Sequence, residues 1–259
     1  MRIHAICNQK GGSGKSALAV NLAAALASLG EKILVIDMDP QASATARLGL
    51  NPDEDEGASW EQLLLKGEGD LAALCQKTSV EGVEIVPAGI KMERAEKSLM
   101  NEIGFEHCLD RLIKSLPPDR YDRVLIDTRP SLGTYTLISL VAAHNVLFPV
   151  VMSRDAVAGT SNLLDLMALV KGRLNPGIYL LGIIACSVQK GPTMDRQILI
   201  WLEENYGKYL FENQISQSVV MRDSESQMKP VTTIFPSHKV SQQFFRLASE
   251  LREREARYV

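Results

Sequence analysis

The chain has 259 residues, of which 46% are hydrophobic and 23% charged, and its formal net charge at pH 7 is −3. This is the composition of a globular protein with a sizeable core, and it argues against a uniformly basic nucleic-acid binder. The longest apolar stretch, residues 137–152, is interrupted by His144, Asn145 and Pro149, so it is too short to cross a membrane. We expect a cytoplasmic protein with a single domain over residues 1–259 and no stable membrane association.

Predicted strands and helices alternate from the first residues onward. Residues 3–7 predict a buried strand, residues 15–29 an amphipathic helix closed by a glycine, and residues 33–37 a second buried strand. Strand, helix and strand at this spacing form a βαβ unit, whose strands are parallel and whose crossover is right-handed.

The rest of the chain continues the alternation after an acidic surface loop predicted at residues 51–57. Further strands are predicted at residues 83–86, 123–127, 146–150 and 178–186, and helices at residues 91–102, 105–115, 132–142, 156–172, 193–206 and 240–257. Together these elements predict an α/β fold with a doubly wound, mostly parallel sheet and helices on both of its faces.

A glycine-rich loop joins the first predicted strand to the first predicted helix. Its sequence over residues 9–16, Q-K-G-G-S-G-K-S, allows backbone N–H groups to close around phosphate oxygens, while the helix N-terminus adds positive potential. In such a loop Lys15 reaches the β- and γ-phosphates of a nucleotide, and the Ser16 hydroxyl binds Mg²⁺. The nucleotide-binding residues predicted here are Lys10, Gly11, Gly12, Ser13, Gly14, Lys15, Ser16 and Ala17.

The loop departs from the common pattern G-x-x-x-x-G-K-[ST] because Gln9 stands where that pattern has glycine. An additional lysine, Lys10, follows it directly. A lysine at this point faces away from its own phosphates in most P-loops. A catalytic role for Lys10 therefore requires a second subunit, and the alternative is a solvated loop lysine.

Three carboxylates follow predicted strands. Asp37 and Asp39 lie at the carboxyl end of the second strand, and Asp127 ends the apolar run at residues 124–126. Ligands of doubly wound sheets gather at the carboxyl ends of the strands, so these side chains should face the nucleotide. A carboxylate after an apolar strand beside a P-loop fits the Walker B role of holding Mg²⁺ directly or through water. The alternative for each carboxylate is a cap at the end of a strand.

These segments resemble the ParA/Soj partition ATPases, within the MinD/ParA class of deviant Walker A P-loop NTPases. The specific matches are NQKGGSGKS at residues 8–16, LVIDMDPQASAT at residues 34–45 and YDRVLIDTRPSLG at residues 121–133. Weaker matches extend the resemblance over almost the whole chain.

The resemblance implies ATP and Mg²⁺ as cofactors and a homodimer that encloses two ATP molecules. In that dimer Lys10 reaches the partner's phosphates and stabilises charge in the transition state, much as an arginine finger does. Lys15 and Asp39 complete the implied catalytic set, Asp39 by positioning or activating the attacking water. The implied metal-binding residues are Ser16, Asp37 and Asp127.

The resemblance also implies a cellular role. In this family the ATP-bound dimer binds DNA with little sequence preference, which places it on the nucleoid. A ParB-like or adaptor protein stimulates an otherwise slow hydrolysis. The resulting cycle partitions or positions a cargo such as a plasmid, a chromosome or a protein assembly.

One departure from the family pattern bears on DNA binding and on adenine contacts. Residues 215–223 read ISQSVVMRD where the family usually resembles I-P-R-N-V-R-L-S-E, so two basic positions and a Pro and Asn near the adenine are replaced. Ser216 and Ser218 become the candidate base contacts. Net charge is −5 over residues 1–149 (15 Lys and Arg, 20 Asp and Glu) and +2 over residues 150–259 (13 and 11), which permits a basic face on the second part. The cations expected to contact DNA phosphates are Lys190, Arg196, Arg222, Lys229, Lys239 and Arg246.

Two alternatives remain from the sequence. A MinD-like ATPase that cycles on a membrane needs a basic amphipathic C-terminal helix, whereas residues 244–255 have their apolar residues early and alternating charges later. A dethiobiotin-synthetase-like ligase needs a substrate pocket beside the γ-phosphate. The only hint of such a pocket is the pair Arg154-Asp155, which better fits the start of a helix.

Overall fold

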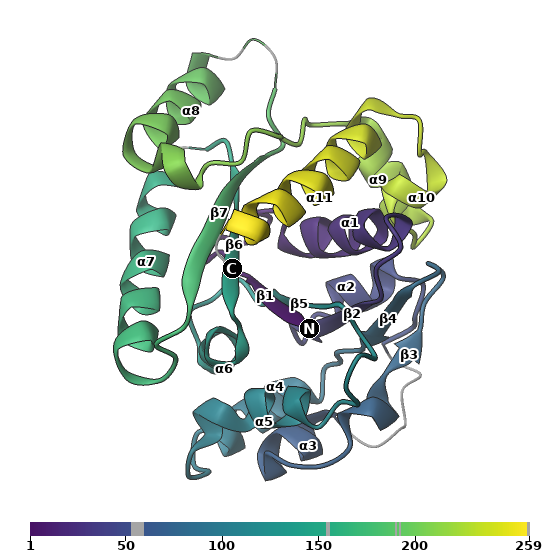
Figure 1. Cartoon of the computed structure of the whole chain (residues 1–259), viewed down its shortest axis with the longest axis vertical. Helices are drawn as coiled ribbons and strands as arrows, with labels where there is room; N and C mark the ends of the chain where they lie inside the picture. The colour runs from purple at the N-terminus through teal and green to yellow at the C-terminus, as the bar shows by residue number, and fades with distance from the viewer. Residues whose placement is uncertain (53–59, 154–155, 190, 192, 258–259) are drawn as a thin grey trace.

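The computed structural model describes residues 1–52, 60–153, 156–189, 191 and 193–257. Within these ranges seven strands form one sheet in the order β3-β4-β2-β5-β1-β6-β7 (Figure 1). Every neighbouring pair is parallel except β3 with β4. The strands are β1 (Arg2–Ile6), β2 (Ile33–Met38), β3 (Gln76–Lys77), β4 (Val83–Val86), β5 (Arg123–Thr128), β6 (Asn145–Val151) and β7 (Tyr179–Cys186). The predicted doubly wound, mostly parallel sheet is confirmed.

Helices cover both faces of this sheet (Figure 1). The helices are α1 (Lys15–Ser28), α2 (Ser43–Arg47), α3 (Trp60–Lys66), α4 (Met92–Leu99), α5 (Cys108–Lys114), α6 (Thr134–Ala142), α7 (Ala156–Arg173), α8 (Thr193–Tyr206), α9 (Val219–Ser226), α10 (Val231–Ile234) and α11 (Lys239–Arg257), with 3-10 turns η1 (Leu71–Leu74), η2 (Phe105–His107) and η3 (Gly207–Tyr209). None of the described helices combines the length and the apolar composition that crossing a bilayer requires.

Alternate residues of the central strands enter two separate cores. On β2, Ile33 and Val35 pack in the core with α1 and α11, while Leu34 and Ile36 pack in the core with α5 and α6. Because both faces are covered, every residue of β2 and β5 is buried, which explains why these strands read as continuous apolar runs.

The boundaries of the longer elements agree with the sequence prediction to within a few residues, and several of the shorter elements were missed. The helix predicted at residues 105–115 begins as the turn η2 before α5, and that at residues 91–102 ends at Leu99. The unpredicted helices α2, α3, α9 and α10 have eight residues or fewer, which is too short for helical periodicity to emerge. Most of the predicted loop at residues 51–57 lies outside the described residues, and a single domain over residues 1–259 stays a prediction.

Strand register determines where the functional side chains meet. Asp127 of β5 pairs with Ile6 of β1 and with Asp37 of β2. The carboxyl ends of the three central strands are therefore level, and the loop that follows β1 emerges beside both carboxylates.

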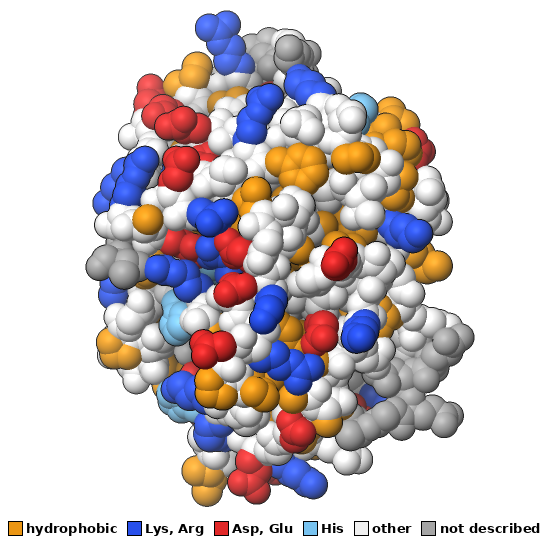
Figure 2. Space-filling view, turned by 45° about the vertical axis from the view of Figure 1, so that its right-hand side comes forward, with side chains coloured by type: hydrophobic (Ala, Val, Ile, Leu, Met, Phe, Trp, Pro, Cys, Tyr) orange, Lys and Arg blue, Asp and Glu red, His pale blue; other side chains and the backbone are white. Residues whose placement is uncertain are grey.

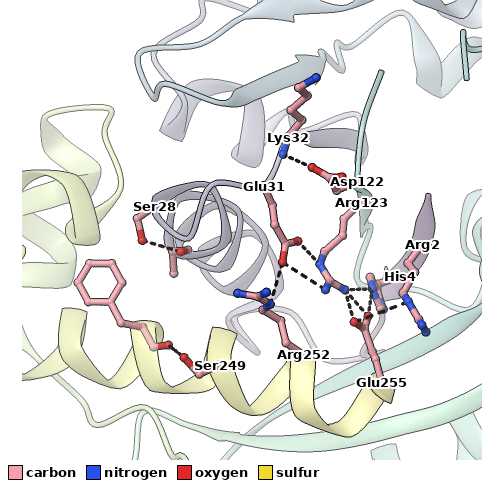
Figure 3. A network of polar contacts seen from close by, with 12 residues as sticks. Arg2, His4, Ser28, Glu31, Lys32, Asp122, Arg123, Ser249, Arg252 and Glu255 are labelled. Atoms are coloured by element: carbon pink, nitrogen blue, oxygen red, sulfur yellow. Dashed lines mark hydrogen bonds and ion pairs between the residues drawn. The ribbon is translucent and has the colours of Figure 1, made fainter. Parts of the chain in front are cut away.

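A buried network of charged side chains connects the C-terminal helix to the end of the sheet that lies opposite the carboxyl ends of the strands (Figure 3). Near the end of α11, Glu255 pairs with His4 of β1, at 2.7 Å between Oε1 and Nε2, and with Arg123 of β5. Arg123 also pairs with Glu31, which precedes β2. Burial lowers the pKa of His4. Burial alone would raise the pKa of Glu255, but hydrogen bonds from His4 and Arg123 outweigh it and hold that pKa at about 2.

Candidate nucleotide-binding site

The loop between β1 and α1 is anchored on one side by Asn8. Its Nδ2 donates to the Pro149 carbonyl of β6 at 2.6 Å, and its Oδ1 accepts the N–H of Lys10 at 2.9 Å. Gly12 and Gly14 have φ angles of +69° and +84°, which glycine adopts without strain. These anchors and glycines give the loop the closed shape that a phosphate cradle needs.

The N-terminus of α1 carries no side-chain cap. Gly14 occupies the N-cap position, so no side-chain oxygen accepts the first N–H groups of the helix. Uncapped N–H groups and the helix dipole together form an anion site. Within the part of the chain that the structure describes, the Ser13 hydroxyl, fully buried in this loop, also has no hydrogen-bond partner. These features match the predicted binding of phosphate oxygens.

Lys15 is the cation at the start of α1. Its side chain is 6% exposed, and its Nζ donates to the Lys10 carbonyl at a long 3.4 Å. Burial lowers its pKa, while the charges of Asp127 and Asp39 act in the opposite direction. Lys15 is therefore a poorly solvated ammonium group, for which a phosphate would be a strong partner.

Asp37 and Asp127 differ in their hydrogen bonding. Asp37 accepts the N–H of Asp39 at 3.1 Å on Oδ1, and on Oδ2 it accepts the N–H and hydroxyl of Thr45 at 2.9 and 2.8 Å. Despite these bonds, burial raises the pKa of Asp37 to about 6. Its oxygens fix the start of α2, which follows β2 closely.

Asp127 is fully buried, and neither of its oxygens has a hydrogen-bond partner among the described residues. Burial and the nearby charge of Asp37 raise its pKa well above the ordinary range, and Ser16 and Lys15 offset this only in part. A buried carboxylate without partners is costly unless a cation balances it. The site thus fits a Mg²⁺ ion held beside Asp127 and Ser16, and it favours Asp127 over Asp37 as the carboxylate nearer the metal.

Among the described residues, no group of three or more His, Cys, Asp or Glu side chains is arranged to hold a metal by itself. This agrees with the coordination of Mg²⁺, which usually keeps water and substrate phosphate ligands and takes only one or two from the protein.

Asp39 and Lys10 differ in their relation to the cleft beside the loop. Asp39 is 8% exposed, lines the cleft and accepts the N–H of Gln41 at 3.1 Å. The Nζ of Lys10 donates to the Ser153 hydroxyl at 2.9 Å. Lys10 is not part of the cleft lining, which is consistent with a lysine that faces away from its own phosphates.

A cleft of about 850 Å³ extends from this loop. One wall consists of the loop and α2, and the other of residues 215–218 and the helix α9 that follows them. Ser216 and Ser218 both line it. Gln243 of α11 already binds Ser216, since its Oε1 accepts the Ser216 N–H at 3.0 Å and its Nε2 donates to the Ser216 hydroxyl at 2.8 Å. The Ser218 hydroxyl caps no helix, so it is the better candidate for a base contact.

Sequence reasoning did not single out several residues of the cleft lining, among them Arg47, Cys186, Glu225 and Phe244. None of these four belongs to a recognisable motif, and only the packing of α2, β7, α9 and α11 brings them to the cleft.

The predicted DNA-contacting cations lie on different surfaces. Arg222 lines the nucleotide cleft, Lys239 a smaller pocket with Ser218, and Arg246 a groove on α11 that also contains Glu250 and Glu253. Arg196 on α8 and Lys229 before α10 are exposed, and Lys190 lies outside the described residues. Figure 2 shows positive and negative side chains interspersed on one face of the molecule. A DNA-binding face stays a prediction.

Comparison with known proteins identifies the family. A family model described as an AAA domain matches residues 1–180. The chromosome partitioning protein ParA of Myxococcus xanthus is 34% identical over 254 residues, 98% of this chain and 89% of that protein. The sporulation initiation inhibitor protein Soj of Bacillus subtilis is 30% identical over 250 residues, 96% of this chain and 98% of that protein. The chain belongs to the ParA/Soj family of P-loop ATPases.

A solved structure extends this likeness to the fold of the family. Cobyrinic acid a,c-diamide synthase of Mycobacterium smegmatis, with a bound ATP analog and magnesium, superposes with a TM-score of 0.83 at 30% identity, covering 96% of this chain and 93% of that one. The family relationship is therefore supported over nearly the whole length of both chains.

Proposed function

We propose that this member of the ParA/Soj family binds ATP with Mg²⁺ in the cleft at the carboxyl ends of β1, β2 and β5, and hydrolyses it in a partition or positioning cycle. The observation that carries the proposal is Asp127, a buried carboxylate for which the described residues offer no hydrogen-bond partner, next to the uncapped N-terminus of α1. The relatives named ParA and Soj and the synthase structure with its ATP analog and magnesium support the same assignment.

Each site residue then has a role. The N–H groups of residues 11–17 bind phosphate oxygens, and Lys15 contacts the β- and γ-phosphates. Ser16 and Asp127 would hold Mg²⁺, with Asp37 behind them, and the metal would neutralise charge that develops on the phosphates. Asp39, which lines the cleft beyond the loop, orients the attacking water and accepts its proton.

The proposal includes a homodimer in the ATP state. Lys10 donates to Ser153 and does not line its own cleft, which supports an action on the nucleotide of a second copy. The dimer binds DNA non-specifically through exposed cations and thereby associates with the nucleoid. A ParB-like or adaptor protein stimulates its slow hydrolysis. The partitioning names of the relatives support this part of the proposal.

The decisive experiment measures binding of random-sequence duplex DNA at low salt with ATP, with ADP and without nucleotide. We expect binding with ATP alone, and a steep loss of affinity as salt rises because phosphate contacts release counterions. Asp39→Ala, which should retain ATP, should bind DNA for longer, and Lys15→Ala should not bind. Absence of DNA binding in every state, with ATP binding intact, would overturn the DNA part of the proposal.

The C-terminal helix supports a membrane-cycling role less well than it supports the partition role. This helix docks on the core of the protein: Phe244, Leu247 and Leu251 of α11 are buried, and α11 packs on α1. Insertion into a bilayer surface would need those apolar side chains. Flotation of the protein with liposomes in the presence of ATP would favour the membrane role instead.

A ligase role is the second candidate function. It is favoured by one finding, that the similar M. smegmatis protein is named a synthase. A ligase consumes ATP only with its acceptor. Phosphate release from ATP by the purified chain without any added acid or amine would therefore count against it.

A further inference from the structure

An ion pair connects the two walls of the nucleotide cleft. Arg47, the last residue of α2, donates from Nη1 to Oε1 of Glu225 on α9 at 2.5 Å. Both side chains line the cleft that holds the phosphate loop. In Figure 1, α2 and α9 lie on opposite sides of α1, the helix that begins at the loop. The pair therefore joins two elements that are far apart in the sequence.

The α2 end of this connection is rigid. Thr45, two residues before Arg47, donates both its N–H and its hydroxyl to Asp37, and its hydroxyl oxygen accepts the N–H of Ala88 at 3.0 Å. Movement of Arg47 is thus restrained by the same carboxylate that lies opposite Asp127.

The α9 end is weakly packed. Ser224 is its only fully buried residue, and Val219 at its start is 65% exposed. A helix with so little buried surface opens locally at low cost in free energy. It nevertheless follows directly after Ser218, the candidate base contact, so its position affects how the base is enclosed.

We propose that Arg47 and Glu225 are positioning residues that hold α9 across the cleft and so slow the release of bound nucleotide. The inference rests on the proposed nucleotide site. Neither residue contacts the reacting atoms; they act through α9 and Ser218. The pair is partly exposed, with side chains 25% and 40% accessible, so its effect is moderate. An exposed ion pair of this kind changes a rate by roughly 1.5- to 5-fold.

The test is a charge reversal followed by a swap. Dissociation of a fluorescent N-methylanthraniloyl derivative of ADP is followed after a chase with excess ATP for the unsubstituted chain, Arg47→Glu, Glu225→Arg and the double variant. We expect both single variants to release nucleotide roughly 1.5- to 5-fold faster and the double variant to approach the original rate. Higher ionic strength should narrow the difference between the unsubstituted and single-variant chains, because salt screens exposed charges.

A matched control reverses a charge in another exposed ion pair. Lys114 pairs with Asp110 within α5 at 2.8 Å, on the other face of the sheet, and Lys114→Glu should leave release unchanged. Glu225→Arg changes a side chain that is 40% exposed, so we expect this variant to fold as the unsubstituted chain does. Thermal unfolding checks this expectation. Two results would overturn this inference and leave the proposed function standing. One is a release rate unchanged in both single variants. The other is a double variant whose release is accelerated by the product of the two single-variant factors. No binding of the fluorescent nucleotide to the unsubstituted chain overturns the proposed function as well.

Discussion

Asp37 and Asp127 lie directly opposite each other on the parallel strands β2 and β5, yet of the two only Asp37 has hydrogen-bond partners among the residues that the structure describes. Two buried carboxylates this close disfavour each other's ionised form. Asp37 is balanced by three donors from α2 and the residues before it, whereas the oxygens of Asp127 have none. The two carboxylates therefore differ in role: Asp37 stabilises the local structure, and Asp127 is available to bind a cation.

Asp127→Asn and Asp37→Asn should have opposite effects on the chain without ligands. Asp37→Asn replaces an accepting oxygen opposite Thr45 with a donor, so the free energy of unfolding should fall by about 1–3 kcal/mol. Asp127→Asn removes a buried carboxylate without partners and should leave the melting temperature unchanged or raise it. It should also lose the stabilisation by ATP that depends on Mg²⁺. Calorimetry with and without Mg-ATP measures both effects, and full stabilisation of Asp127→Asn by Mg-ATP would remove Asp127 from the metal site.

Lys15→Ala should weaken ATP binding by about 10- to 100-fold, because one or two hydrogen bonds to charged phosphate are lost. Titration calorimetry with a non-hydrolysable ATP analog gives the affinity directly. Lys32→Ala, at an exposed lysine before β2, is the matched control and should bind as the unsubstituted chain does. Equal affinity in Lys15→Ala and the control would refute the phosphate-loop assignment.

Asp39→Ala should keep ATP binding and slow hydrolysis roughly 100-fold or more, the usual contribution of a group that positions and deprotonates water. The side chain lines the cleft but is not part of the loop, so affinity should change little. Single-turnover hydrolysis separates the two quantities. A parallel loss of affinity and rate would instead assign Asp39 to nucleotide binding.

Glu255→Gln should lower the free energy of unfolding by about 3 kcal/mol, because Arg123 and His4 lose a buried carboxylate partner. The pKa of Glu255 is about 2 in the folded chain, below its ordinary value of 4.5. Its contribution is thus fully present above pH 4.5 and is lost as pH falls toward 2. Chemical unfolding between pH 7 and pH 3 should show a constant difference between the two chains above pH 4.5 that narrows below it. A difference independent of pH would mean that the carboxylate charge is not what stabilises α11.

The loss of stability of this network at acidic pH also involves His4. Burial lowers its pKa below the ordinary 6.5, so the unfolded chain binds its proton first. Stability from this group is present above pH 6.5 and is lost as pH falls through the interval below it. His4→Gln should therefore flatten the decline of stability between pH 6.5 and pH 5, measured by the same chemical unfolding.

Gly182→Ala tests the packing of β7 against the segment that leads to the cleft. A Cβ at Gly182 would lie 2.1 Å from the Phe211 ring and 2.8 Å from the Tyr209 carbonyl, so about 1–3 kcal/mol of stability should be lost. Gly172→Ala in α7, where nothing lies within 4 Å of the new Cβ, is the control and should stabilise the chain by about 0.5–1 kcal/mol. Thermal unfolding distinguishes the two, and equal melting temperatures would contradict the packing argument.

Much of the site was predictable because it is local. The glycines and lysine of the loop follow one strand and begin one helix, so their spacing in the sequence is enough to indicate a phosphate loop. The carboxylates could be placed near it because parallel strands end at the same edge of the sheet. Ser216 was expected at the base, but its hydrogen bonds to Gln243 of α11, 27 residues later, could not be read from either segment.

The sequence by itself determined the βαβ unit, the phosphate loop and the edge of the sheet at which the carboxylates gather. Only the tertiary structure decided which carboxylate lacks partners and which residues close the cleft. Thr45 donates to Asp37 because α2 turns back over β2, and Arg47 meets Glu225 across 178 residues because α9 packs on α10, which in turn packs on α1. Short helices such as α2 and α9 carry no periodic signal of their own, so their positions depend on packing against the rest of the chain.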